Sequence, residues 1–263
     1  AGAQIVVGTP GRLRDHLEAH AMAEEKYFYP TLLELGKGAL DSDSADETTE
    51  FIVSASYVEI YMERVRDLLD NSKHNLQIRE DPLKGVYVQG MTEEFVGSAD
   101  ELIDVMKLGK QNRATAATGM NAGSSRSHSC FCIKIHQRDT ETESTKTGRM
   151  YLVDLAGSEM VRKTGASGQQ LDEAKMINRS LSALGNVINA LTEGKGHVPY
   201  RNHPLTQMMS DSLGGNAKTL MFVNFSPADY NKAETESSLN FAERVKKVKN
   251  KANKAVQSKE VAA

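Results

Sequence analysis

An apolar strand that runs directly into an acidic, glycine-containing loop, residues 150–159, is the feature that most constrains the fold of this chain. Met150 to Val153 form a short apolar run, Asp154 follows at once, and Gly157 comes three residues later. An aspartate at the end of such a strand can hold a hydrated Mg²⁺, and a glycine backbone N–H can reach a terminal phosphate. The pattern predicts a phosphate-sensing loop at the edge of a sheet.

A second polar loop, residues 121–128, lies upstream and has complementary chemistry. Ser124 and Ser125 offer hydroxyl groups, and Arg126 could form a bidentate pair with Glu159 when a γ-phosphate is present. The alternative is that Asp154 only caps a strand and that the serines are ordinary loop hydroxyls. Finding both motifs in one chain, in this order, favours a nucleotide switch.

These two loops resemble switch I (N-x-x-S-S-R-S-H) and switch II (D-L-A-G-S-E) of kinesin motor domains. The resemblance runs from about residue 51 to about residue 250 and includes Tyr57 to Tyr61, Arg66 to Asp70, Asn178 to Leu184, Val198 to Arg201 and Asp211 to Asn216. It implies an α/β fold with a layered, mostly parallel central sheet and helices on both faces. It also implies ATP and Mg²⁺ as cofactors, and the microtubule (tubulin) as partner.

The resemblance assigns a role to each matching position. Ser124 and Ser125 would contact Mg²⁺ or the terminal phosphate, with Asn121 beside them, and His128 would help to order switch I. Asp154 would hold Mg²⁺ through water, and Gly157 would sense the γ-phosphate. Arg126 and Glu159 would close the pocket over the attacking water. The catalytic group is then Ser125, Arg126, Gly157 and Glu159.

The microtubule-binding residues also follow from the resemblance. The helix after switch II, expected from about Gln169 to Thr192, would be the main contact. Lys163 would lie in the loop before it, Lys175 and Arg179 on its face, and Arg201 in the next loop. Pro204 and Gln207 stand where kinesins commonly carry Lys and Arg, which predicts a reduced affinity. The plain alternative is that these cations are solvated surface groups.

A P-loop of the form G-x-x-x-x-G-K-S/T cannot be written onto the printed sequence, although a kinesin ATPase needs one. Its backbone amides and Lys hold the phosphates, so we expect this chain to hydrolyse ATP poorly or not at all. Three interpretations remain open. The chain is a kinesin motor domain, a microtubule-binding module without nucleotide turnover, or an RNA-binding helicase remnant.

The last interpretation comes from residues 5–17, which resemble the T-P-G-R region of DEAD-box RNA helicases. A strand–turn–helix that fills a gap in the sheet, or a joined reading frame, is favoured over a working helicase, and nucleic acid is not expected as a partner. We therefore expect a divergent segment over 1–50 that ends in an acidic loop, a partial motor core over 51–250, and a basic neck or linker over 251–263.

Hydrophobic patterns place strands at Phe51–Tyr61, Val86–Val96, Ser127–Gln137, Arg149–Leu155 and Thr219–Ser226. Ser98 and Glu101 form a capping box that predicts a helix to about Ala117. A longer helix follows from an apolar stripe at Leu171, Ala174, Ile177, Leu181, Leu184, Ile188 and Leu191. Lys175 and Arg179 lie off this stripe and should face outward.

Composition adds a few limits. Hydrophobic residues make up 39% of the 263 residues and charged residues 25%, as in an ordinary globular chain. Cys130 and Cys132 are two apart on one strand face, too close in sequence for a disulfide across it. A metal site with His128 and His136 is less favoured than a core or sheet-surface role. We expect a cytoplasmic, cytoskeletal protein with no membrane segment, and the oligomeric state stays open.

Overall fold

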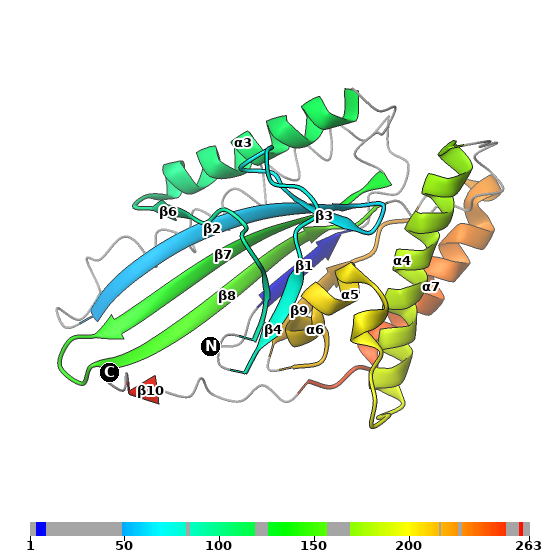
Figure 1. The fold of residues 1–263 in the computed structure, drawn as a ribbon. Coiled ribbons are helices and arrows are strands. Elements are labelled where there is room, and N and C mark those ends of the chain that lie inside the picture. The colour runs from blue at the N-terminus through cyan, green and yellow to red at the C-terminus, as the bar shows by residue number, and fades with distance from the viewer. Residues whose placement is uncertain are drawn as a thin grey trace.

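The computed structural model describes residues 4–8, 49–82, 85–118, 126–156, 169–215, 217–225, 228–250 and 258–259. Its centre is a sheet with the strand order β3-β2-β7-β8-β1-β9, with β6 also paired to β2 and β10 to β8 (Figure 1). The strands are β1 (Gln4–Gly8), β2 (Thr49–Tyr61), β3 (Arg64–Asp67), β6 (Glu94–Val96), β7 (His128–Asp139), β8 (Ser144–Asp154), β9 (Lys218–Phe222) and β10 (Ser258–Lys259). A separate ribbon pairs β4 (Ile78–Asp81) with β5 (Gly85–Val88).

The expectation of a mostly parallel sheet is wrong for the described strands. Only β1 pairs in parallel, with β8 on one side and β9 on the other, whereas β3, β2, β7 and β8 pair antiparallel with one another. The reason is the length of the connections. Asp139 and Ser144 are separated by a turn of four residues, which allows a hairpin but not a parallel crossover.

The long strands alternate their side chains between two hydrophobic cores, one on each face of the sheet. On one face Val53, Ala55 and Tyr57 of β2 pack with Phe131 and Ile133 of β7 beneath helix α3 (Ala99–Thr118). On the other face Val58 and Ile60 of β2 pack with Val153 of β8 and with Leu184 and Ile188 of helix α4 (Gln169–Thr192). The layered α/β architecture with helices on both faces is therefore confirmed.

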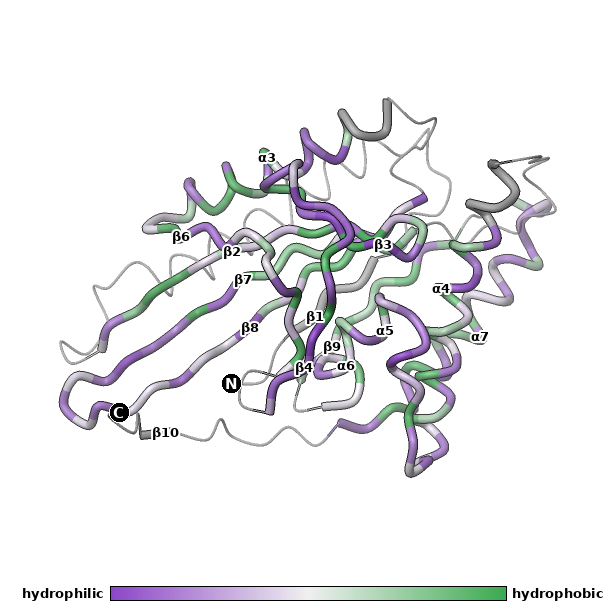
Figure 2. Tube along the Cα trace, viewed as in Figure 1, coloured by the Kyte–Doolittle hydropathy of each residue, from purple (hydrophilic) through white to green (hydrophobic). Residues whose placement is uncertain are grey.

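Among the described residues, the face opposite α3 carries the other helices. They are α4 (Gln169–Thr192), η5 (Tyr200–Asn202), α5 (Pro204–Met208), α6 (Ser210–Leu213), η6 (Asp229–Asn231) and α7 (Lys232–Lys246). Figure 2 shows hydrophobic stretches where the strands meet these helices, and hydrophilic residues around the β7–β8 hairpin at the far end. The hydrophobic residues of the long strands therefore concentrate toward the end of the sheet away from this hairpin.

Both predicted helices are present. The α4 bounds match the expected ones, and the described members of the stripe, from Ile177 onward, include the buried Leu184 and Ile188. At the start of α3, Ser98 Oγ accepts a hydrogen bond from Glu101 N at 3.2 Å. The Glu101 carboxylate accepts from Gly97 N at 2.8 Å, one residue before the position that the capping box predicts.

The predicted strand Val86–Val96 is wrong as a single element. It divides into β5, which pairs with β4, and β6, which pairs with β2. Gly90 lies between them with a φ of +79°, a left-handed conformation that ends an extended strand and suits glycine. The other predicted strands are present with shifted ends, and β9 ends at Phe222.

The N-terminal strand β1 lies inside the sheet. Gly8, its last residue, is in register with Asp154 on one neighbour and with Phe222 on the other. The predicted strand within residues 5–17 is thus observed, filling the position between β8 and β9, while the predicted turn and helix fall outside the described residues. Because β1 and β8 run in parallel, both end at the same edge of the sheet.

The two cysteines are buried and unbridged, as their spacing predicts. Burial raises the pKa of Cys132 to about 11 and that of Cys130 well above its ordinary value. Both thiols therefore stay protonated and behave as small hydrophobic side chains.

Candidate functional site

Asp154, the last residue of β8, stands at the carboxyl edge of the parallel strands and is held there by α3. Arg113 Nη1 donates to Asp154 Oδ2 at 2.8 Å. The Arg113 side chain is 10% exposed, whereas that of Asp154 is 42% exposed. The aspartate is thus fixed on its protein side and reachable from solvent, as a hydrated cation would require.

Arg113 is the hub of a buried polar network. Its Nη1 also donates to Ser129 Oγ at 3.0 Å, and its Nη2 donates to the Ser127 carbonyl at 2.9 Å. Its Nε lies 3.5 Å from Glu59 Oε1. Burial opposes the charge, but the carboxylates of Asp154 and Glu59 outweigh it and raise the pKa of Arg113. The guanidinium is therefore permanently charged in this site.

Glu59 continues the network on the central strand β2. It is 2% exposed and pairs with Arg66 of β3 as well as with Arg113. A buried carboxylate is stable only with such partners. Successive ion pairs therefore connect Arg66 on β3, through Glu59 and Arg113, to the partly exposed Asp154 at the end of β8.

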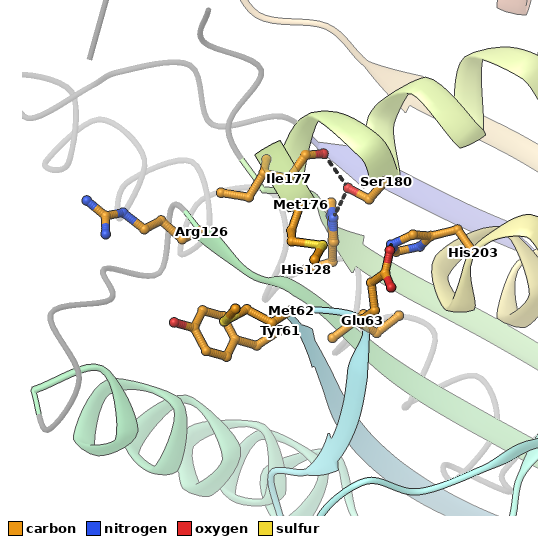
Figure 3. A pocket seen from close by; sticks show the side chains of 10 residues that line it. Tyr61, Met62, Glu63, Arg126, His128, Met176, Ile177, Ser180 and His203 are labelled. Atoms are coloured by element: carbon orange, nitrogen blue, oxygen red, sulfur yellow. Dashed lines mark hydrogen bonds and ion pairs between the residues drawn. The ribbon is translucent and has the colours of Figure 1, made fainter. Parts of the chain in front are cut away.

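His128 joins three segments of the site. Its Nδ1 accepts a hydrogen bond from the backbone N–H of Ala156 at 2.9 Å, so its Nε2 carries the proton. Nε2 donates to Ser180 Oγ at 2.7 Å, and that hydroxyl donates to the Ile177 carbonyl at 2.6 Å. Figure 3 shows this path from His128 into α4. His128 therefore ties the start of β7 to the segment after β8 and to α4.

The protonation state of His128 supports this arrangement. Burial, with smaller effects of His203 and Arg113, lowers the pKa of His128 to about 3. The ring is neutral at pH 7 and keeps one donor and one acceptor, which both have partners. His128 is thus a positioning group rather than a proton carrier at this pH.

A small pocket borders these residues (Figure 3). It is lined by Ile60 to Glu63 at the β2–β3 turn, by Arg126 and His128, and by α4 residues such as Met176. Two of the predicted nucleotide-site residues, Arg126 and His128, therefore share one pocket wall. Asp154 is not part of this lining.

Several predicted site residues fall outside the described residues. They are Asn121, Ser124, Ser125, Gly157, Glu159 and Lys163. The pair of Arg126 and Glu159 therefore stays a prediction, as do the Mg²⁺ contacts of Ser125. The structure brings His128 and Asp154 close together, because β7 pairs with β8 and Ser129, the neighbour of His128, lies opposite Asp154.

The three described microtubule-binding candidates all lie on the surface. Lys175 and Arg179 face outward from α4, as predicted, and Arg201 lies in η5 with its side chain 78% exposed. Arg179 Nη1 is 3.0 Å from Glu63 Oε1, and Arg201 Nη2 is 2.7 Å from Glu80 Oε2. Each of these two arginines thus has a carboxylate partner from a distant segment.

Arg113, Glu59 and Ser180 were not predicted as site residues. Arg113 and Ser180 lie at apolar-stripe positions of their helices: Arg113 follows Leu102, Met106 and Gly109, and Ser180 lies between Ile177 and Leu184. A polar residue on a buried stripe is a signal that could have identified both.

The described residues contain neither a metal-binding cluster nor a helix that could span a membrane. Within them, no group of three His, Cys, Asp or Glu side chains is suited to a metal, so the considered site at His128 and His136 has no such cluster. None of the described helices combines the length and apolarity that crossing a bilayer requires.

The model of the kinesin motor domain family matches residues 22–248 of this chain. Kinesin-related protein 3 of Dictyostelium discoideum is 58% identical over 210 residues, which are 80% of this chain and 18% of that protein. Kinesin heavy chain of Syncephalastrum racemosum is 59% identical over 204 residues, 77% of this chain and 22% of that protein. The chain thus spans about a fifth of the length of these relatives.

Solved structures agree. A fast kinesin superposes with a TM-score of 0.85 at 46% identity, over 99% of this chain and 75% of that one. A KIF14 dimer solved with AMP-PNP in complex with a microtubule gives a TM-score of 0.81 at 35% identity, over 96% of this chain and 74% of that one. With the family model covering most of its length, the chain belongs to the kinesin motor domain family.

Proposed function

We propose that this chain is part of a microtubule-based motor, in which the segment after β8 responds to a bound nucleotide and α4 carries the response to the filament. The observation that carries the proposal is the double contact of His128 with Ala156 and Ser180. If the backbone at Ala156 shifts, His128 and α4 must shift with it, or one of these hydrogen bonds must break. Membership of the kinesin motor domain family supports the same role.

The described residues fit a Mg²⁺–nucleotide at the end of β8. Hard cations prefer carboxylate oxygen and water ligands, and Asp154 presents a partly exposed carboxylate there. When bound, Mg²⁺ would neutralise phosphate charge. Arg113 would orient Asp154 from behind, and His128 would hold the following backbone in place.

We further propose that turnover by this chain is weak. The printed sequence holds no G-x-x-x-x-G-K-S/T motif, and positioning with charge stabilisation supplies most of the catalysis in phosphoryl transfer. A microtubule-binding module without turnover is therefore the second candidate, and the exposed cations on α4 and η5 support it. RNA binding through residues 9–12 stays a prediction with no described contact.

Microtubule co-sedimentation without nucleotide, with AMP-PNP and with ATP separates the two candidates. A motor should bind differently in at least one nucleotide state, and ATP-driven release would support it. Binding that no nucleotide changes would leave only the module. Absence of binding at low salt would remove both.

The coupling through His128 has its own test. Ser180→Ala removes the Nε2 partner on α4, and we expect it to weaken the nucleotide dependence of filament binding. Ser182 is exposed on the same helix, so Ser182→Ala is the matched control. Equal nucleotide dependence in the two variants would contradict the proposed path.

A further inference from the structure

The carboxylate of Glu63 holds Arg179 across two elements that are far apart in the sequence. Arg179 Nη1 lies 3.0 Å from Glu63 Oε1, an ion pair without hydrogen-bond geometry, and the two side chains are 62% and 30% exposed. Glu63 belongs to the β2–β3 turn, whereas Arg179 belongs to α4. The arginine is thus drawn toward the turn while most of its surface still faces solvent.

A two-residue β-hairpin turn holds Glu63 in this position. Tyr61 pairs with Arg64, and the two residues between them, Met62 and Glu63, have φ values of 48° and 62°. Two successive positive φ values are the usual geometry of a two-residue β-hairpin turn, but glycine, asparagine and aspartate normally occupy these positions, so Met62 and Glu63 are unusual residues for it. The conformation directs the Glu63 carboxylate toward α4 and the start of α5.

His203 completes the surroundings of that carboxylate. Its Nδ1 accepts from Leu205 N at 3.1 Å, so its proton is on Nε2, which lies 4.0 Å from Glu63 Oε1. The two side chains point toward one another in Figure 3. Glu63 therefore faces one group from α4 and one from the start of α5.

A second pair repeats the pattern. Arg201 Nη2 lies 2.7 Å from Glu80 Oε2, with side-chain exposures of 78% and 58%. Here the arginine comes from η5 and the carboxylate from β4. In both pairs an arginine of the predicted filament-binding face is compensated by a carboxylate from the β2–β5 segment.

We propose that Glu63 and Glu80 compete with the acidic groups of a filament for Arg179 and Arg201. A partner with acidic side chains binds this face by exchange, taking the place of Glu63 on Arg179 and of Glu80 on Arg201. The inference rests on the proposed microtubule binding. It adds that the chain lowers its own affinity, and that these two carboxylates set by how much.

Solvent exposure ranks the two competitors. Exposed ion pairs are weak, so neutralising Glu80 should strengthen filament binding by about twofold to fivefold at most. Glu63 is less exposed and the turn fixes its position, so neutralising it should strengthen filament binding by roughly threefold to tenfold. Both gains should shrink at high salt because exposed charges are screened.

The experiment measures the Kd for microtubules at low salt for the wild type, Glu63→Gln, Glu80→Gln and each change combined with Arg179→Ala or Arg201→Ala. Removing any negative charge favours an acidic filament, so the double variants are decisive. Exchange predicts that Glu63→Gln gains affinity only when Arg179 is present, and Glu80→Gln only when Arg201 is present. A gain that persists without the arginine would overturn the inference.

The outcomes also separate the inference from the proposed function. If the wild type binds and neither glutamine variant binds more tightly, only the inference is overturned. If the wild type fails to bind but a glutamine variant binds, and this binding is lost together with the paired arginine, the inference is supported. If no variant binds, both fail. Thermal unfolding of each variant checks that it still folds. Glu80 lies on β4, outside the β2–β3 turn, so Glu80→Gln tests the inference without disturbing that turn.

Discussion

Nη1 of Arg113 in α3 lies 2.8 Å from Oδ2 of Asp154 at the end of β8. The two residues belong to different layers of the fold, so the position of the exposed aspartate depends on how α3 packs on the sheet. The same guanidinium compensates Glu59, which is 2% exposed.

Replacing Arg113 by Met should therefore lower the free energy of unfolding strongly. It leaves the buried Glu59 with one partner fewer, and breaking a buried ion pair costs about 3–5 kcal/mol. Lys107 on the same helix pairs with Asp104 and is 55% exposed, so Lys107→Met should change stability by less than about 1 kcal/mol. Urea unfolding of both variants checks this, and similar losses would contradict the role of Arg113.

Stability should depend on pH through His128. Its folded pKa of about 3 lies below the unfolded value of about 6.5, so its contribution is complete above pH 6.5. As the pH falls from 6.5 toward 3, only the unfolded state gains the proton. The free energy of unfolding should then fall by up to about 1.4 kcal/mol per pH unit from this group.

The variant His128→Gln should flatten that dependence between pH 6.5 and 5, where most carboxylates have not yet titrated. The pKa of His203 is lowered too, mainly by burial, so a shallower slope of the same sign should remain. Chemical unfolding at several pH values measures both slopes. An unchanged slope in the variant would show that His128 is not the group that titrates.

Two helical glycines should respond in opposite directions to alanine. A Cβ on Gly109 would lie 2.2 Å from Cδ1 of Tyr57, so Gly109→Ala should force α3 away from β2 and cost about 1–3 kcal/mol. A Cβ on Gly185 meets nothing within 4 Å, so Gly185→Ala in α4 should stabilise by about 0.5–1 kcal/mol. Thermal or urea unfolding of the pair is the measurement, and a loss in both would contradict the packing.

Met62→Asn should stabilise the β2–β3 turn. Met62 has a φ of 48°, and asparagine tolerates the left-handed region better than most residues, so we expect a gain of about 0.5–1 kcal/mol. Met62→Ala removes the same side chain without this preference and should not stabilise. Comparing the two in urea unfolding isolates the backbone effect. An equal result for both would mean that the turn is not strained at this residue.

Long hydrophobic patterns made much of the fold predictable. The stripe through Leu184 and Ile188 predicted α4, and the alternation in β2 and β7 located both strands. Strand direction was not predictable from these patterns, because alternation indicates which face is buried but not which strand is the neighbour. Short polar strands such as β3 (Arg64–Asp67) were missed because their pairing, not their composition, makes them strands.

The residues of the candidate site were also predictable only in part. Asp154 and His128 were found because their loops resemble known switch motifs. The partners Arg113, Glu59 and Ser180 come from other elements, and only the packing of α3 and α4 on the sheet brings them there. Ion pairs such as Arg179 with Glu63 join residues with no local sequence signal, so they could not have been predicted.

The position of β1 has a consequence for synthesis on the ribosome. This strand leaves the exit tunnel long before its neighbours at Met150–Asp154 and Lys218–Phe222. At a translation rate of about 5–20 residues per second, it waits on the order of ten seconds or more for its second neighbour. During that time the apolar run at Ile5 to Val7 lacks its complete place in the sheet, and exposed apolar segments of this kind are prone to wrong contacts until β9 has left the tunnel.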